Sequence, residues 1–176
     1  MEQRHLGRSG LWVSTIALGT MTWGEDTEEG EAADLLATFV DAGGTLIDTA
    51  DIYQGGQGER ILGRLLPTVV RRDDVIIATK AGHCLDRRRP SNTSRRHLLA
   101  ALEASLRRLQ TDYVDLWQLH VYDPTTPLEE TLAAVDSAVA SGKARYVGVG
   151  QVTGWQLARY ATWQQATLAS GSSPIV

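Results

Sequence analysis

The chain has 176 residues, of which 43% are hydrophobic and 22% charged, a composition typical of a globular protein with one sizeable core. Its formal net charge of -4 and its mixture of acidic and basic residues argue against nucleic acid or an anionic membrane surface as a partner. Cys84 is the only cysteine, which excludes an intramolecular disulfide and argues against a thiolate-rich metal site, so no bound metal is expected.

The first segment with a structural signal is His5–Val13, which predicts a small hairpin with its turn at Gly10. Short apolar segments then alternate with helical patterns along the rest of the chain. The strands are expected at residues 16–19, 45–47, 75–79, 113–119 and 144–149. The helices are expected at residues 27–42, 59–66, 94 or 95 to 109, 128–140, and 154 or 155 to 168.

Local signals set several of these boundaries. Thr27 is expected to cap the first helix, and Pro67 to end the second. Between the third strand and the third helix, Arg87–Arg89 forms a basic cluster with Arg95 and Arg96. The cluster has no aromatic residues interleaved for base stacking, so it is interpreted as a solvated loop and helix start. After the fifth helix, residues 171–174 predict a turn, and Ile175–Val176 predicts the beginning of another strand.

Strict alternation of strands and helices predicts a parallel sheet covered by helices, within a single domain over residues 1–176. A doubly wound open sheet and a (β/α)8 TIM barrel both fit this pattern. A barrel typically needs about 250 residues. Five βα units followed by the start of a sixth therefore predict an incomplete barrel. Three explanations for the incomplete barrel are ranked in this order: a fragment of a longer enzyme, a truncated gene product, and half-barrels completed by a second chain.

The reactive residues follow the predicted strands. Asp48 comes directly after the second strand, and Tyr53 lies in the adjoining loop. Lys80 follows the third strand, and His120 follows the fourth. Each has an ordinary alternative: a turn-capping Asp, a solvated lysine, a structural histidine. Because the carboxyl ends of parallel strands meet on the functional side of such a sheet, their coincidence there predicts a catalytic site.

The chemistry of these side chains points to carbonyl reduction. An ammonium group on Lys80 beside the Tyr53 hydroxyl would favour the phenolate and make the phenol a better acid. Asp48 would hold Lys80 in place, and His120 would donate a hydrogen bond to the substrate oxygen. Tyr53 would then protonate the oxygen that becomes negative as hydride reaches the carbonyl carbon. No side chain delivers hydride, so a nicotinamide cofactor is required.

These motifs resemble the aldo-keto reductase family over the whole chain. The matching stretches are Leu6–Gly10, Leu18–Gly24, Gly44–Glu59, Lys80, Leu119–His120 and Gly142–Val149. By this resemblance, Asp48, Tyr53, Lys80 and His120 correspond to the family's catalytic tetrad, and the implied activity is NADPH-dependent reduction of aldehydes or ketones. A small-molecule carbonyl compound is then the expected partner, in a cytoplasmic setting.

The resemblance also implies positions around the tetrad. Gly19, Thr20 and Met21, with Asp48, match positions near the cofactor in similar proteins. Trp23 would wall the substrate pocket, although packing in the core is an equal alternative. Tyr122, together with Asp123, would line the mouth of the same pocket. These assignments stay expectations that follow from the family pattern.

The chain departs from the family pattern after the fifth strand. The family usually carries Ser-Asn there, whereas this chain has Gly150–Gln151, so Gln151 is the candidate that contacts the nicotinamide carboxamide. One lost hydrogen bond costs roughly 0.5–1.5 kcal/mol. The surrounding Gly148–Gly154 run also resembles a dinucleotide fingerprint. Its spacing is one residue too long, and no acidic residue follows Gln151, so a Rossmann site is excluded.

Two functions remain open from the sequence. The first is a reductase, in which the cofactor cleft of a five-unit chain would be incomplete, so that the chain alone is expected to be inactive. The second is a non-catalytic binding or regulatory protein on the same scaffold, a use known in this family from potassium-channel beta subunits. Binding of NADPH without turnover would favour the second function.

Overall fold

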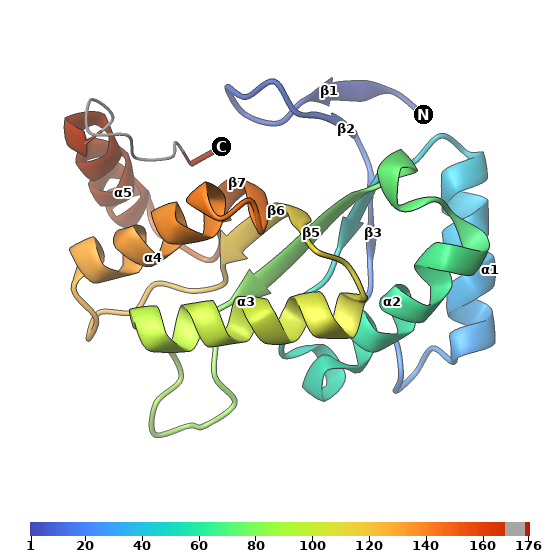
Figure 1. Ribbon diagram of the computed structural model, residues 1–176, viewed down its shortest axis with the longest axis horizontal. Coiled ribbons are helices and arrows are strands. Elements are labelled where there is room, and N and C mark those ends of the chain that lie inside the picture. The colour runs from blue at the N-terminus through green and yellow to red at the C-terminus, as the bar shows by residue number, and fades with distance from the viewer. Residues whose placement is uncertain (168–174) are drawn as a thin grey trace.

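Five parallel strands form one sheet in the order in which they occur along the chain (Figure 1). The computed structural model describes residues 1–167 and 175–176. The strands of this sheet are β3 (Ala17–Gly19), β4 (Leu46–Asp48), β5 (Ile76–Ala81), β6 (Val114–Leu119) and β7 (Ala144–Val149). In a doubly wound sheet the strand order would reverse part-way. The sequential order is that of consecutive βα units of a TIM barrel, as expected.

A helix follows each of these strands and packs on the outer face of the sheet (Figure 1). The helices are α1 (Glu29–Asp41), α2 (Gln57–Val69), α3 (Arg95–Leu109), α4 (Leu128–Ala140) and α5 (Gly154–Thr167). The core lies between sheet and helices, where Ile47, Ile77 and Leu98 are completely buried. Because side chains alternate along a strand, the opposite face of the sheet is free to carry polar groups.

The chain begins with the predicted hairpin, an antiparallel pair of β1 (Gln3–His5) and β2 (Trp12–Ser14). The hairpin lies near the last residue, since a Cβ added at Gly7 would be 3.1 Å from the Val176 carbonyl carbon. Ile175 forms a parallel bridge with Val147 of β7, so the chain resumes a strand beside the fifth one. The turn expected at residues 171–174, like the end of the fifth helix at Leu168, lies outside the described residues.

Two boundary predictions were wrong. Thr27 does not cap α1, because the N-cap is Glu28 and the Thr27 hydroxyl bonds to that of Thr22 at 2.9 Å. Pro67 does not end α2, which continues to Val69. Proline removes one amide hydrogen bond from a helix, and within the last turn this loss leaves the preceding bonds intact. Both differences lie away from the strand ends and leave the order of elements unchanged.

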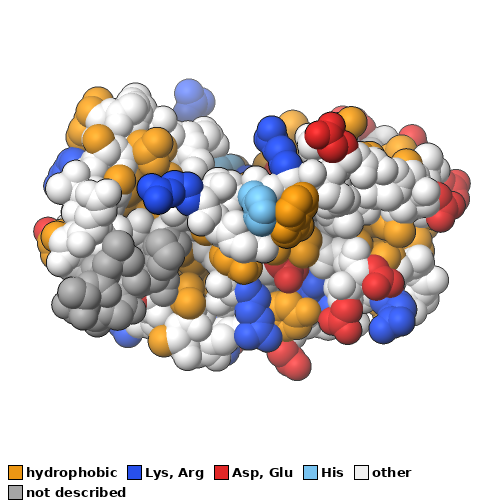
Figure 2. Space-filling model, turned by 90° about the horizontal axis from the view of Figure 1, so that it is seen from above, with side chains coloured by type: hydrophobic (Ala, Val, Ile, Leu, Met, Phe, Trp, Pro, Cys, Tyr) orange, Lys and Arg blue, Asp and Glu red, His pale blue; other side chains and the backbone are white. Residues whose placement is uncertain are grey.

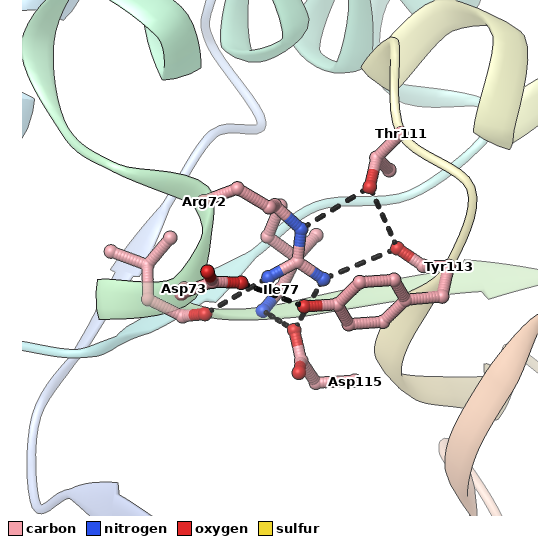
Figure 3. A network of polar contacts seen from close by, with 7 residues as sticks. Arg72, Asp73, Ile77, Thr111, Tyr113 and Asp115 are labelled. Atoms are coloured by element: carbon pink, nitrogen blue, oxygen red, sulfur yellow. Dashed lines mark hydrogen bonds and ion pairs between the residues drawn. The ribbon is translucent and has the colours of Figure 1, made fainter.

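Arg72, in the 3-10 turn Arg72–Asp74, clamps the amino-terminal end of the sheet (Figure 3). Its guanidinium group donates to Asp115 Oδ2 at 2.6 Å, to the Tyr113 carbonyl at 3.2 Å and to Thr111 Oγ1 at 3.3 Å. The same Asp115 oxygen accepts the backbone N–H of Ile77 at 2.9 Å. One carboxylate therefore joins the connection before β5 to both β5 and β6.

The face of the molecule on which the hairpin lies carries charged side chains of both signs. Figure 2 shows acidic and basic side chains interspersed with apolar ones over this face. Among the residues that the structure describes, no helix is long and apolar enough to cross a membrane. Within the same residues, no group of three or more His, Cys, Asp and Glu side chains could hold a metal ion.

Replacing Asp115 should destabilise the fold, because the Arg72 guanidinium and the Ile77 N–H would lose their shared partner. The two ion-paired side chains are only 18% and 13% exposed. Asp115→Ala is expected to lower the free energy of unfolding by about 2–4 kcal/mol, measured by urea denaturation. Glu29→Ala is the control, because it breaks an ion pair with Arg64 whose side chains are 45% and 46% exposed. Equal effects of the two substitutions would contradict the clamp.

Candidate active site

Strands β4 and β5 present a carboxylate and an ammonium group on the same face of the sheet. Asp48 ends β4 and pairs in register with Ala78 of β5. Lys80 lies two positions beyond Ala78, so its side chain leaves the sheet on the side of Ala78 and Asp48. This face is opposite to the one that packs on the helices. The strand register alone therefore brings Asp48 and Lys80 together.

The Lys80 ammonium group is held by three oxygen atoms. It donates to Asp48 Oδ2 at 2.8 Å, to the Thr49 carbonyl at 2.8 Å and to the Tyr53 hydroxyl at 3.2 Å. An ammonium group has three protons, so these bonds use its full donor capacity. The Lys80 side chain is 12% exposed and that of Asp48 35% exposed. The ion pair is thus shielded on the lysine side and open on the carboxylate side.

Tyr53 reaches Lys80 through a tight turn after the strand. The Tyr53 N–H donates to the Ala50 carbonyl at 3.2 Å, and a 3-10 segment over Tyr53–Gly56 follows. Gln54 and Gly56 have φ values of 49° and 87°. A Cβ at Gly56 would lie 2.8 Å from Arg108 Cδ, so glycine is required there by both backbone and space. This left-handed turn leads the chain from Tyr53 directly into α2.

His120 completes the group from β6. Its ring packs edge-on to Tyr53 with the centroids 6.0 Å apart. Burial, then the nearby Lys80 charge, lowers the pKa of His120 to about 4, so the imidazole is neutral near pH 7. The residue is only 5% exposed, and its buried Nδ1 has no hydrogen-bond partner among the described residues. The ring retains hydrogen-bonding capacity for a ligand.

Comparison with known proteins shows the family of the chain. The profile of the Aldo/keto reductase family matches residues 15–172. The chain belongs to the aldo/keto reductase family.

Relatives and a solved structure cover nearly all of this chain. The aldo-keto reductase YhdN of Bacillus subtilis is 38% identical over 157 residues, 85% of this chain and 46% of that protein. A probable voltage-gated potassium channel subunit beta of Oryza sativa is 35% identical over 178 residues, 100% of this chain and 54% of its own length. The holo form of an aldo-keto reductase from Bacillus halodurans superposes with a TM-score of 0.84 at 34% identity, covering 100% of this chain and 56% of that one. The chain spans about half the length of these aldo/keto reductase family relatives.

Of the three residues expected near the cofactor of an aldo-keto reductase, Gly19 and Thr20 lie beside Asp48. Gly19 pairs in register with Asp48, and a Cβ added at Gly19 would meet nothing within 4 Å. Thr20 is completely buried, and its N–H donates to the Asp48 carbonyl at 3.1 Å. Met21 is 60% exposed. The backbone around Gly19 therefore borders open space next to the carboxylate.

The other expected residues have different surroundings. Trp23 is 1% exposed and belongs to the hydrophobic core, which favours its packing role over a role as pocket wall. Gln151 is exposed and has a positive φ of 48°. Its side chain makes no hydrogen bond to another of the described residues, so the amide is free for a ligand.

Tyr122 and Asp123 lie just beyond His120, and both are hydrogen-bonded to other parts of the chain. The Tyr122 hydroxyl accepts a hydrogen bond from Arg159 at 2.9 Å. Burial alone would raise the pKa of Asp123, but hydrogen bonds lower it to about 2. The residues that donate these bonds are Thr125, Thr93 and Thr126. The Asp123 carboxylate is thus occupied by hydrogen bonds within the protein.

A buried acid behind the tetrad was missed from the sequence. Glu59 is 0% exposed and accepts hydrogen bonds from Thr79 Oγ1 and Arg108 Nε, both at 2.6 Å. These bonds tie the first turn of α2 to β5 and α3, and so hold the loop that carries Tyr53. No local signal marks Glu59 as buried, because its partners lie 20 and 49 positions away.

Asp51 lies in the same loop as Tyr53, and its carboxyl group is unusual. Its Oδ1 atom is buried and has no hydrogen-bond partner among the described residues. Burial, reinforced by the negative charge of Glu59, raises the pKa of Asp51 to about 7, while Arg108 opposes the rise. Asp51 therefore carries a proton at mildly acidic pH. Glu59 keeps Arg108 as its direct partner.

The proton on Asp51 should make stability fall as the pH rises. An unfolded chain loses this proton near pH 4, whereas the folded chain keeps it up to about pH 7. The folded state binds more protons in this window, so the free energy of unfolding decreases with increasing pH. Asp51→Asn should stabilise the fold by roughly 2–4 kcal/mol at pH 8 and by much less at pH 5.

The measurement is urea denaturation of both proteins at the two pH values. Asp34→Asn, on the exposed side of α1, is the matched control and should behave like the unaltered chain at both. If Asp51→Asn changes stability equally at pH 5 and pH 8, the proton is not held in the folded state.

Proposed function

We propose that the protein reduces aldehydes or ketones to alcohols with NADPH, with Tyr53 as the general acid. The observation that carries this proposal is the 3.2 Å hydrogen bond from the Lys80 ammonium group to the Tyr53 hydroxyl. Because the hydroxyl oxygen accepts this bond, its own proton is free to point toward a substrate. The same ammonium group stabilises the phenolate that remains after proton transfer.

Asp48 acts through Lys80 in this scheme. Its carboxylate lies 2.8 Å from the ammonium nitrogen and offsets the cost of keeping a charge on a side chain that is only 12% exposed. The Thr49 carbonyl fixes the third proton of Lys80. The ammonium group is therefore held in one position, with the Tyr53 oxygen as its remaining partner.

His120 orients the substrate. Its neutral imidazole can donate one hydrogen bond to a carbonyl oxygen, and its edge-on packing against Tyr53 puts the two groups on the same side of the site. A carbonyl oxygen between them would receive a hydrogen bond from His120 and the proton from Tyr53. A neutral donor also avoids a second positive charge beside Lys80.

The residues around the tetrad fit a nicotinamide. The open space next to Gly19 leaves room for a flat ring beside Asp48, and the free Gln151 amide can bond its carboxamide. Gly150 lacks the hydroxyl that the family usually places there. When bound, NADPH supplies the hydride that reduces the carbonyl carbon. Thr20 supports this wall through its bond to the Asp48 carbonyl.

A regulatory function is the second candidate. It is favoured by the match of the whole chain to a probable potassium channel subunit beta at 35% identity. On this alternative, the protein would bind NADPH and respond to it without turning over carbonyl substrates. NADPH binding by fluorescence and NADPH oxidation with a panel of aldehydes separate the two functions.

Tyr53→Phe should lower kcat for aldehyde reduction by about 10²–10⁴-fold, because the proton donor is lost. The affinity for NADPH should stay nearly unchanged. Both are measured in the protein that carries this chain, by NADPH oxidation and by fluorescence titration. Tyr113→Phe is the control, because it removes a phenol hydroxyl at the opposite end of the sheet. Full activity of Tyr53→Phe would exclude this residue as the acid.

A further inference from the structure

A groove of about 420 Å³ opens beside the tetrad, at the carboxyl ends of β5 and β6. Cavities of roughly 300–1,000 Å³ are of the size that holds small molecules. The lining of this groove includes His83, Arg88, Arg89, Tyr122 and Gln151. Two walls of the groove thus come from the loops after β5 and β6, the strands that lead to Lys80 and His120.

Arg88 and Arg89 lie on an ordered hairpin between β5 and α3, which projects from the sheet in Figure 1. His83 and Ser91 form an antiparallel bridge at its base. Above the bridge, the Cys84 N–H donates to the Pro90 carbonyl at 2.9 Å. The two arginines are therefore held by backbone bonds at a defined place beside the groove.

The groove lies next to the reacting groups, because His83, which lines it, packs against His120. The His83 ring packs edge-on to His120 with the centroids 5.3 Å apart. His120 packs in the same way against Tyr53 at 6.0 Å. A substrate long enough to span these rings, with its carbonyl between His120 and Tyr53, would place its other end at the groove that His83 lines.

The charges at this end of the groove are unpaired. Within the described residues, neither Arg88 nor Arg89 forms an ion pair, and the Arg88 guanidinium makes no hydrogen bond. Arg89 donates to the neutral Asn92 amide oxygen at 3.0 Å. The one carboxylate on the hairpin, Asp86, accepts the backbone N–H of Arg88 at 2.9 Å. The Asp123 carboxylate, near the groove, is occupied by threonine donors.

We infer that this groove binds an anionic group of the carbonyl substrate, a carboxylate or a phosphate, through Arg88 and Arg89. Guanidinium groups suit such groups because their fork of N–H donors matches two oxygens at once. The inference rests on the proposed reductase function and adds its substrate class: aldehydes or ketones that carry a negative charge at the end away from the carbonyl. Two arginines of the basic cluster, Arg88 and Arg89, are then part of the binding site.

The test compares two aldehydes of the same shape, 4-formylbenzoate and 4-formylbenzamide, which differ in charge. Binding of each is measured by isothermal titration calorimetry, and reduction of each by NADPH oxidation. The variant is the double substitution Arg88→Gln and Arg89→Gln. Arg87→Gln is the matched control, because Arg87 is an exposed neighbour that does not line the groove.

The unaltered protein should bind 4-formylbenzoate at least tenfold more tightly than 4-formylbenzamide. The double variant should lose this preference and bind the benzamide unchanged, and Arg87→Gln should keep it. Equal binding of the two aldehydes, or a preference that survives in the double variant, would overturn the inference.

Two further readouts separate related explanations. If the double variant weakens NADPH binding but not NADH binding, the arginines bind the cofactor phosphate, and the inference is wrong. If both aldehydes are reduced equally well, the reductase function stands and the anionic substrate class fails. If the arginines bind 4-formylbenzoate but neither aldehyde is reduced, the anion site stands and the reductase function fails.

Discussion

The position of the Lys80 ammonium group is the constraint on which the site depends. Its three protons are used by a strand carboxylate, a backbone carbonyl and a phenol, and these come from the end of β4 and the loop behind it. A charge on a side chain that is 12% exposed is tolerated only where each donor has a partner. The three hydrogen bonds of Lys80 therefore stabilise this conformation of the loop, and the loop in turn holds the lysine in position.

Two further carboxyl groups, those of Glu59 and Asp51, lie behind the tetrad. Glu59 pairs with Arg108 and accepts a hydrogen bond from Thr79, whereas Asp51 has an oxygen without a hydrogen-bond partner among the described residues. One cation satisfies one buried anion, and the second acid avoids the cost of a buried charge by keeping its proton. The two carboxyl groups thus hold the loop of Tyr53 from behind, and Asp51 stays uncharged below about pH 7.

Much of the scaffold could be predicted from the sequence, because the alternation of strands and helices is a local pattern. The bounds of α4 and β7 agree with the expected ranges, and the strand-end positions of Asp48 and Lys80 follow from residue order alone. The helix boundaries at Thr27 and Pro67 were not predicted, because they depend on local context and tertiary contacts. Thr27 bonds to Thr22 instead of capping a helix, and Pro67 is tolerated in a final turn.

The parts of the site that escaped prediction depend on distant partners. Glu59 meets Arg108, which is 49 positions away, so no window of sequence shows that its charge is paired. Asp123 lies three positions after His120, and three threonines from two loops donate hydrogen bonds to its carboxylate. The sequence therefore predicts well which polar residues lie at the strand ends. It predicts less well which of them are hydrogen-bonded to other residues of the chain.

The agreement between strand order and chain order also matters during synthesis. Each strand from β4 to β7 adds to a sheet edge formed by the strand just before it, and successive helices α1 to α4 pack against one another. Each of these pairings joins a strand to the unit just before it and needs no segment from later in the chain. The ribosome releases these units in the order in which they assemble, so a growing sheet can extend one unit at a time. The contact between Gly7 and Val176 joins segments far apart in the sequence, so it can form only after both have been synthesised.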